Sequence, residues 1–312
     1  MTILVDALTV VYNAGSPLER VALRNVNLWA PDGACVAIVG VTGSGKSTLA
    51  QTLNGLITPA IGRVVVDDLE LTARGLRGKE LRALRRRVGL LFQFPEGQLF
   101  APTIGEDVAF GPRQLKMKPR EALERARWAL RAVALPDDDA FLARSPFALS
   151  GGQRRRVALA GVLAMRPRAL ALDEPSAGLD AEGREEIYAT LRELRRQDGL
   201  TLLIISHDMS EVAALAERVF VLRDGELRLS GTPAEVFQRG DELAACGLLA
   251  PPLAQVAGLA REHGLLAVEP DTLTPETLGQ KVAAALAAGD GRDGEPETRA
   301  LASLGGDDAH AG

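Results

Sequence analysis

Apolar residues recur with two different periods along the chain, and the two periods separate expected strands from expected helices. Residues 2–11 and 21–30 combine β-branched residues with an alternation of apolar and polar positions, which indicates strands. Cys35–Val39 is apolar at every position, as in a strand that is buried on both faces. Further strands are expected near 62–67, 88–92, 169–173 and 201–206.

Helical patterns lie between these strands. We expect helices over about 46–56, 119–134 and 181–197, and a mostly helical stretch from about 95 to 164. Apolar strands that alternate with helices predict an α/β fold with a mainly parallel sheet. The helical stretch interrupts that order, so it predicts a subdomain inserted between two strands of the sheet.

The composition changes after Gly240, where Ala, Leu and Pro become frequent. Two short helical patterns follow, near 251–263 and 274–287. Residues 288–312 are rich in Gly, Asp, Ala and Glu and offer almost nothing to bury, so we expect a disordered tail. The pattern therefore divides the chain into a main domain over 1–240, a helical extension over 241–287 and this tail.

The composition is that of a soluble globular protein, with 46% apolar and 25% charged residues. A net charge of −5 argues against a surface that binds nucleic acid broadly. Cys35 and Cys246 have no metal-binding spacing, so we expect two small buried side chains in a reducing compartment.

No segment is expected to cross or to be carried across a membrane. The N-terminus has no basic region before an apolar run, so it does not resemble a secretory signal. Leu243–Ala260 carries no charge, but Pro251 and Pro252 interrupt it and much of it is Ala, Gly and Gln. A spanning helix needs about 20 strongly apolar residues, which this stretch does not supply.

A glycine-rich loop follows the apolar run that ends at Val39. It fits the P-loop pattern G-x-x-x-x-G-K-[ST] completely, with a strand before it and a helix after it. In that pattern backbone N–H groups surround phosphates, Lys46 faces the β and γ oxygens and the Ser47 hydroxyl ligates Mg²⁺. We assign to phosphate binding Gly40, Val41, Thr42, Gly43, Ser44, Gly45, Lys46, Ser47 and Thr48.

Polar side chains follow two other expected strands. Asp173 and Glu174 end the apolar run Leu170–Leu172, which places Asp173 beside the P-loop as a Mg²⁺ ligand and Glu174 near the γ-phosphate. Glu174 can then act as the general base for an attacking water. Gln93 follows the strand near 88–92, and its amide can reach both Mg²⁺ and that water. Ser47, Gln93 and Asp173 are therefore the predicted metal ligands.

Another glycine-containing segment, Leu149–Gln153, precedes a helix expected to begin near Gln153. Ser150 offers a hydroxyl, and Gly151 and Gly152 offer unobstructed N–H groups, at the kind of helix N-terminus that binds phosphate. The basic runs 85–87 and 154–156 fall within expected helices. We interpret them as solvated helix faces, with contact to phosphate or to a partner as the lesser alternative.

These motifs together resemble those of ATP-binding-cassette (ABC) ATPases, in the same order, over about residues 2–240. The matching elements are the P-loop, Gln93, Leu149–Gln153, Asp173-Glu174, Ser176–Asp180 and His207. The resemblance implies the P-loop NTPase fold of that family. It has a mainly parallel core sheet, an N-terminal antiparallel β subdomain, a helical signature subdomain and here a small helical C-terminal extension.

The resemblance also implies roles for particular residues. Ser150, Gly151, Gly152 and Gln153 would contact ATP held by a second ATPase subunit, and Asp180 would lie at the same interface. His207 would contact the γ-phosphate. Tyr12 would stack on adenine, although an ordinary core or surface tyrosine is the alternative. ATP and Mg²⁺ are the implied cofactors.

A narrower resemblance begins just after Gln93. The runs Phe92–Phe100, Glu106–Pro112 and Arg155–Met165 are similar to those of the ATPase subunits of energy-coupling-factor (ECF) importers for vitamins and metals. This implies a peripheral protein on the cytoplasmic face of the cell membrane. Its partners would be a second ATPase subunit, a transmembrane coupling subunit and a membrane subunit that binds the transported substrate.

Within this resemblance, Glu96 would meet an arginine of the transmembrane subunit. The residues 94–96 look more like one member of an unlike pair, which favours a heterodimer over a homodimer. A soluble ABC ATPase that acts on nucleic acid or the translation machinery is the alternative, but the chain lacks the insertions usual there. Intact Lys46, Glu174 and His207 oppose a regulator without activity.

Overall fold

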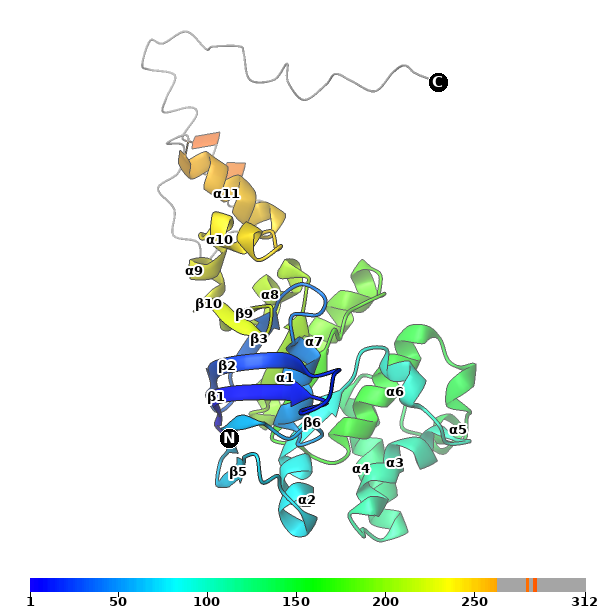
Figure 1. Ribbon diagram of the computed structural model, residues 1–312. Helices are drawn as coiled ribbons and strands as arrows, with labels where there is room; N and C mark the ends of the chain where they lie inside the picture. Colours follow the sequence, from blue (N-terminus) through cyan, green and yellow to red (C-terminus); the bar gives the residue numbers. More distant parts are fainter. Residues whose placement is uncertain (263–278, 281–282, 285–312) are drawn as a thin grey trace, which may run out of the picture. The chain divides into compact units, whose positions relative to one another are not determined.

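The computed structural model describes residues 1–262, 279–280 and 283–284 (Figure 1). Internal contacts divide the chain into two units, Met1–Pro251 and Pro252–Gly312. In the second unit the structure describes α11 (Pro252–Glu262) and the four helical residues 279–280 and 283–284. Most of the helix expected near 274–287, and the tail expected over 288–312, lie outside the described residues.

A six-stranded sheet forms the centre of the first unit, with the strand order β10-β9-β3-β8-β7-β6. All neighbouring strands are parallel except β10 and β9, so the expectation of a mainly parallel sheet is confirmed. The bounds are β3 (Cys35–Val39), β6 (Val88–Leu91), β7 (Ala169–Asp173), β8 (Thr201–Ser206), β9 (Arg218–Arg223) and β10 (Glu226–Gly231).

Alternate residues of these strands belong to two different hydrophobic cores. In β7, Leu170 and Leu172 pack into the core that includes the helical subdomain, whereas Ala169 and Ala171 pack into the core beneath the N-terminal strands. Successive side chains of a strand point to opposite faces, so a strand buried on both faces must be apolar throughout. This explains the continuous apolar runs in the sequence.

The N-terminal strands form a separate antiparallel sheet with the order β2-β1-β4-β5. Its strands are β1 (Ile3–Tyr12), β2 (Arg20–Ala30), β4 (Ile61–Val66) and β5 (Leu69–Leu71). Buried residues of this sheet share one core with α1 (Lys46–Leu53), which follows β3. The sheet thus places the end of β1 over the start of α1, as the hydrogen bond between Tyr12 and Thr48 shows.

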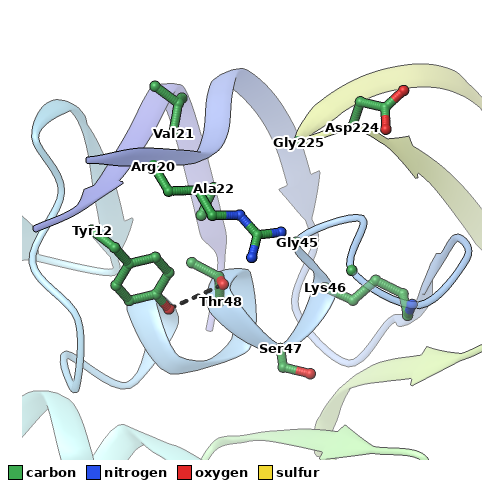
Figure 2. A pocket seen from close by; sticks show the side chains of 11 residues that line it. Tyr12, Arg20, Val21, Ala22, Gly45, Lys46, Ser47, Thr48, Asp224 and Gly225 are labelled. Atoms are coloured by element: carbon green, nitrogen blue, oxygen red, sulfur yellow. Dashed lines mark hydrogen bonds between the residues drawn. The ribbon is translucent and has the colours of Figure 1, made fainter. Parts of the chain in front are cut away.

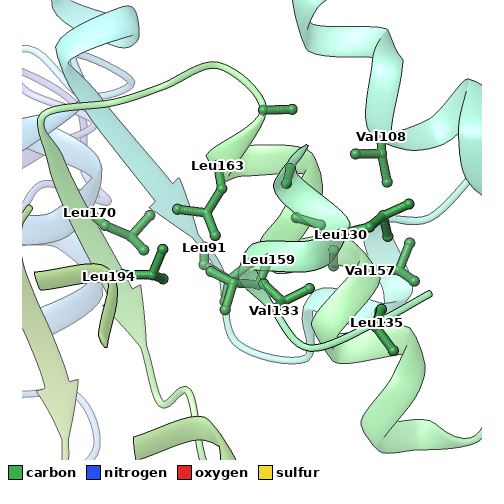
Figure 3. Packing of buried hydrophobic residues seen from close by; sticks show 14 of the residues in the cluster. Leu91, Val108, Leu130, Val133, Leu135, Val157, Leu159, Leu163, Leu170 and Leu194 are labelled. Carbon is green, nitrogen blue, oxygen red and sulfur yellow. The ribbon is translucent and has the colours of Figure 1, made fainter. Parts of the chain in front are cut away.

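Helices inserted between β6 and β7 make up the helical subdomain. They are η1 (Pro95–Gln98), α3 (Ile104–Gln114), α4 (Pro119–Ala132), α5 (Asp139–Leu142), η2 (Pro146–Ala148) and α6 (Gly151–Leu163). Figure 3 shows how α6 joins this subdomain to the sheet: Leu163 faces Leu91 of β6 at one end, and Val157 lies among helical residues at the other. α4 lies where the amphipathic pattern predicted a helix.

The remaining helices of the first unit connect or flank the strands. They are α2 (Gly78–Arg87), α7 (Ala181–Asp198), α8 (Met209–Leu215), α9 (Pro233–Phe237) and α10 (Gly240–Ala245). Cys35 and Cys246 are both buried, as expected. The uncharged stretch Leu243–Ala260 is divided between α10 and α11, and no helix within the described residues is long and apolar enough to cross a membrane.

One expectation about the basic runs was wrong. Arg155 is only 3% exposed, and its guanidinium lies among backbone carbonyls rather than in solvent. The apolar pattern of α6 could not reveal this, because the partners of Arg155 come from a loop about twenty residues later in the chain. Arg156 pairs with Glu186 of α7 at 3.1 Å, and it too is largely covered.

Gly89 of β6 provides a test of how closely α6 packs on the sheet. A Cβ at this position would lie 2.7 Å from Val162 Cγ1, closer than real side chains approach, and at a tight 3.1 Å from Leu170 Cδ1. We therefore expect Gly89→Val to lower the free energy of unfolding by about 1–3 kcal/mol through overpacking. Chemical denaturation of the full chain measures this value.

Gly161→Ala in α6 is the matched control, because a Cβ there would meet nothing within 4 Å. We expect it to be neutral or to stabilise the protein by up to about 1 kcal/mol. Equal losses of stability in both variants would contradict the packing proposed for Gly89.

Candidate nucleotide-binding site

Four of the segments singled out in the sequence meet at one edge of the central sheet. The P-loop follows β3, Gln93 follows β6, Asp173 ends β7 and His207 follows β8. These four strands are parallel, so their carboxyl ends lie along the same edge. In open α/β sheets this edge is where ligands bind.

Glycines in the P-loop bring the backbone against neighbouring chain segments. Gly40 has φ +157° and Gly45 has φ +105°, and a Cβ on Gly40 would lie 2.3 Å from the carbonyl oxygen of Leu222. A Cβ on Gly45 would lie 2.6 Å from Leu23 Cδ2. Only glycine combines this backbone conformation with such close approaches.

Lys46 lies across the loop that carries it. Its Nζ donates to the carbonyl oxygens of Gly40 at 2.7 Å and Val41 at 2.9 Å. Burial lowers the pKa of Lys46, and the negative charges of Glu174 and Asp173 oppose that shift. Gly45 leaves the N-terminus of α1 without a side-chain cap, and such free N–H groups bind phosphate.

Asp173 and Ser47 lie within hydrogen-bonding contact of each other. Burial raises the pKa of Asp173, whereas the hydrogen bond from Ser47 and the charge of Lys46 lower it. A carboxylate beside a hydroxyl fits the way Mg²⁺ is held at phosphate sites, by one or two protein oxygens together with the phosphates. The described residues contain no group of three or more His, Cys, Asp or Glu that could hold a metal alone.

Glu174 makes side-chain contacts with both neighbouring loops. Its Oε2 accepts a hydrogen bond from Gln93 Nε2 at 3.2 Å, and its Oε1 lies 2.6 Å from His207 Nδ1. Its backbone has φ +53°, an uncommon conformation for a residue other than glycine, and its N–H donates to Ile205 O at 2.8 Å. The structure therefore brings together Gln93, Glu174 and His207, which are far apart in the sequence.

An open cavity of about 410 Å³ lies between the P-loop and the N-terminal sheet (Figure 2). Tyr12 lines it, and its hydroxyl is 3.1 Å from Thr48 Oγ1. Gly43, Gly45, Lys46, Ser47 and Thr48 line its other side. The size is within the range of small-ligand sites.

Arg20, which was not expected at the site, also lines this cavity. Figure 2 shows its side chain extending from β2 into the space between Tyr12 and Gly45. A lone arginine at the start of a strand gives no signal in the sequence. Its position becomes informative only once the sheet that carries it is placed over the P-loop.

Ser150 and Gln153 cap the helix that they begin. Ser150 Oγ accepts from the Gln153 N–H and Gln153 Oε1 accepts from the Ser150 N–H, both at 3.3 Å. α6 consequently starts at Gly151, two residues before the expected position. None of the residues 150–153 lines the cavity beside Tyr12. Asp180 similarly caps α7, accepting from Gly183 N–H at 2.8 Å.

Two further charged residues lie close to the site. Glu96 Oε2 is 3.7 Å from Arg155 Nε of the same chain, so its nearest cation is an internal one. Glu211 of α8 is 1% exposed and forms hydrogen bonds with Ser206, which ends β8, and with Ser176, in the loop after Glu174. Its Oε1 has no hydrogen-bond partner among the described residues. Glu211 gives no signal in the sequence, because a single Glu in a short helix is usually solvated.

A P-loop core sheet, an antiparallel N-terminal sheet and an inserted helical subdomain together define the class of ATP-binding-cassette ATPases. A family model described as ABC transporter matches residues 23–177. The energy-coupling factor transporter ATP-binding protein EcfA2 of Symbiobacterium thermophilum is 47% identical over 293 residues, which cover 94% of this chain and 99% of that protein. The protein of that name from Clostridium tetani is 44% identical over 264 residues, covering 85% and 90%.

Solved structures agree with this relationship. One is cbiO1 from Clostridium perfringens, part of the ABC transporter complex cbiONQ, with a TM-score of 0.67 and 34% identity over 82% of this chain and 98% of that chain. Another is a dimeric ATP-binding cassette in a post-hydrolysis state with ADP and Pi, with a TM-score of 0.64 and 32% identity over 74% and 98%. The chain belongs to the family of energy-coupling factor transporter ATP-binding proteins, and it is an ATP-hydrolysing P-loop ATPase.

Glu211 leads to a prediction about pH. Burial raises the pKa of its carboxyl, and hydrogen bonds from Ser206 and Ser176 oppose that shift. Since the folded-state pKa lies above the unfolded one, Glu211 contributes stability at low pH that is lost as the pH rises through the folded-state pKa. We expect Glu211→Gln to raise the thermal unfolding temperature more at pH 8 than at pH 5.

Thermal unfolding of the wild type and the variant at both pH values measures this difference. The exposed Glu182→Gln on α7 serves as the control, and its effect should not depend on pH. A Glu211→Gln effect that is equal at pH 5 and pH 8 would show that the carboxyl is ionised throughout.

Proposed function

We propose that this chain is the ATP-hydrolysing energy-coupling subunit of an ECF-type ABC importer for a vitamin or a transition-metal micronutrient. The observation that carries the proposal is the position of Glu174, between Gln93 and His207 and close to Lys46 and Asp173. ATP would join two such ATPase subunits, and hydrolysis would separate them. A transmembrane coupling subunit would convert this motion into transport.

Each residue at the sheet edge has a role in this proposal. The P-loop N–H groups and Lys46 bind the β and γ phosphates, and Tyr12 stacks on adenine. Ser47, Asp173 and Gln93 would hold Mg²⁺, which neutralises charge on the phosphate oxygens. Glu174 accepts a proton from the attacking water, while His207 holds its carboxylate and contacts the γ-phosphate.

The two glycines that begin α6 support a site shared between two subunits. A Cβ on Gly151 or Gly152 would meet nothing within 4 Å, and neither residue has a positive φ. Nothing in the part of the chain that the structure describes therefore requires glycine at these positions. A close approach by an external group does explain it, and the N-terminus of α6 suits the phosphates of ATP bound to a second ATPase subunit.

The helical subdomain carries the features expected for docking to a membrane subunit. Phe94, Phe100 and Phe110 are exposed, at 58%, 61% and 45%, and Glu96 is near them in the chain. The rings of Phe100 and Phe110 contact each other edge to face, with their centroids 4.9 Å apart. Exposed apolar side chains that gather in this way mark interaction sites. We propose that a transmembrane coupling subunit docks here, near Glu96, with a separate substrate-binding membrane subunit in the complex. The chain would then be peripheral, on the cytoplasmic face of the membrane, in an unlike pair of ATPases.

Replacing Glu174 tests the catalytic proposal. Glu174→Gln keeps the shape of the side chain and its contact with Gln93 but removes the base. We expect steady-state ATP hydrolysis to fall about 10²–10⁴-fold while ATP affinity stays within about twofold. Phosphate release and equilibrium nucleotide binding measure the two quantities, with Glu182→Gln as the control. Wild-type turnover in Glu174→Gln would reject Glu174 as the base.

Replacing Gly151 tests the shared site. Gly151→Ala should leave the unfolding temperature unchanged or raised, because the added methyl group meets open space. If ATP of a second subunit approaches this backbone, hydrolysis should fall about tenfold or more through misplacement of the reacting groups. Gly161→Ala, in the same helix, should retain full activity. Full activity of Gly151→Ala would argue against a shared site.

A further inference from the structure

Arg155 is buried between three segments that contribute to the site. It lies on α6, five residues after Ser150, and is 3% exposed. A buried arginine is costly unless its charge and its N–H groups are satisfied. The partners that satisfy Arg155 therefore indicate what its position does for the protein.

The first partners are carbonyl groups of the loop between β7 and α7. Arg155 Nη1 donates to Pro175 O at 3.2 Å and also to Ala177 O. The N–H of Ala177 in turn donates to Glu174 O at 3.2 Å. Arg155 thus binds the carbonyl of Ala177, and the N–H of the same residue binds the backbone carbonyl of Glu174. The backbone of Glu174 is itself in the left-handed conformation.

The second partner is the carboxylate of Glu96 on η1. Arg155 Nε lies 3.7 Å from Glu96 Oε2, close enough for attraction between charges but too far for a hydrogen bond. Glu96 Oε2 is buried and accepts no hydrogen bond from any residue that the structure describes. The contact is consequently a loose one, which a small displacement of η1 can strengthen or break.

The segment that contains Glu96 also contacts Glu174 directly. Gln93, three residues before Glu96, donates directly to Glu174 Oε2 at 3.2 Å. Displacement of the segment 93–96 therefore reaches Glu174 by two routes, through the Gln93 amide and through Glu96, Arg155 and the carbonyls of Pro175 and Ala177. A guanidinium presents five N–H donors in a rigid plane, whereas an ammonium group is a compact point charge at the end of a flexible side chain, so lysine would not reproduce this arrangement.

We propose that Arg155 is a positioning residue for ATP hydrolysis. It fixes the position of the loop after Glu174 relative to the segment that contains Glu96. A partner docked at Glu96 would therefore control the orientation of the Glu174 carboxylate. This inference rests on the proposed function, in which Glu174 is the base and a membrane subunit docks near Glu96. Arg155 itself contacts neither the nucleotide nor the water.

The test is a double-substitution cycle in the transporter complex that the full-length chain forms with its partners. Arg155→Lys keeps the positive charge but replaces the planar guanidinium. Glu96→Gln keeps the shape of the side chain but removes its negative charge. The rate of one turnover per bound ATP is measured at saturating ATP, so that loss of folded protein or of affinity does not enter. KM for ATP and the unfolding temperature are recorded beside it.

We expect Arg155→Lys to lower the single-turnover rate about tenfold and Glu96→Gln about threefold, with KM unchanged within about twofold. Because both act through one connection, the double variant should be about tenfold slower, not about thirtyfold. Arg156→Lys is the matched control, since Arg156 pairs with Glu186 instead, and its rate should equal that of the wild type.

Independent, multiplicative effects or an unchanged rate in Arg155→Lys would overturn the proposal. If Arg155→Lys does not assemble, Glu96→Gln alone decides, and a wild-type single-turnover rate in it overturns the proposal. Glu174→Gln, measured in parallel, distinguishes failure of the proposed function from failure of the role proposed for Arg155. Turnover that survives Glu174→Gln rejects the proposed base, whereas its loss beside normal rates in the Arg155 and Glu96 variants rejects only the role of Arg155.

Discussion

The conformation of the loop that begins at Glu174 is the constraint on which the site depends. Glu174 follows directly after a fully buried strand, yet its backbone turns into the left-handed region. Such a conformation persists in a residue other than glycine only where the surroundings hold it. Here the Ile205 carbonyl, the Gln93 amide, the His207 ring and, through the loop carbonyls, Arg155 all do so.

Buried charge is the second common feature of the site. Lys46, Asp173, Glu211 and Arg155 are all nearly covered. Each has neighbours that the fold brings from other segments, although Glu211 Oε1 has no hydrogen-bond partner among the described residues. Low polarity around them strengthens every interaction with an incoming charge. A site that has already removed water from its own charged groups is suited to the polyphosphate of ATP, because little reorganisation remains when the nucleotide binds.

Much of the fold and of the site was predictable because it depends on local pattern. The apolar run before Gly40, the P-loop itself and the carboxylates after Leu172 were recognisable without coordinates, and their meeting at one edge follows from parallel strands. Arg155, Glu211 and Arg20 were not predictable. Each is an ordinary polar residue in its own segment, and only its contacts with residues distant in the sequence indicate a role at the site. Glu96 was predicted to meet a partner subunit, but its internal contact with Arg155 was not foreseen.

The difference between what the sequence determined and what only the tertiary structure decided has a physical reason. The sequence alone determined the strand and helix periods, the phosphate-binding loop and the class of ATPase, since these depend on the order of residues within short segments. The tertiary structure decided which buried charges face one another, that Ser150 and Gln153 cap their own helix, and that Gly151 and Gly152 face open space. Those properties depend on distances between segments that the chain brings together only when it folds.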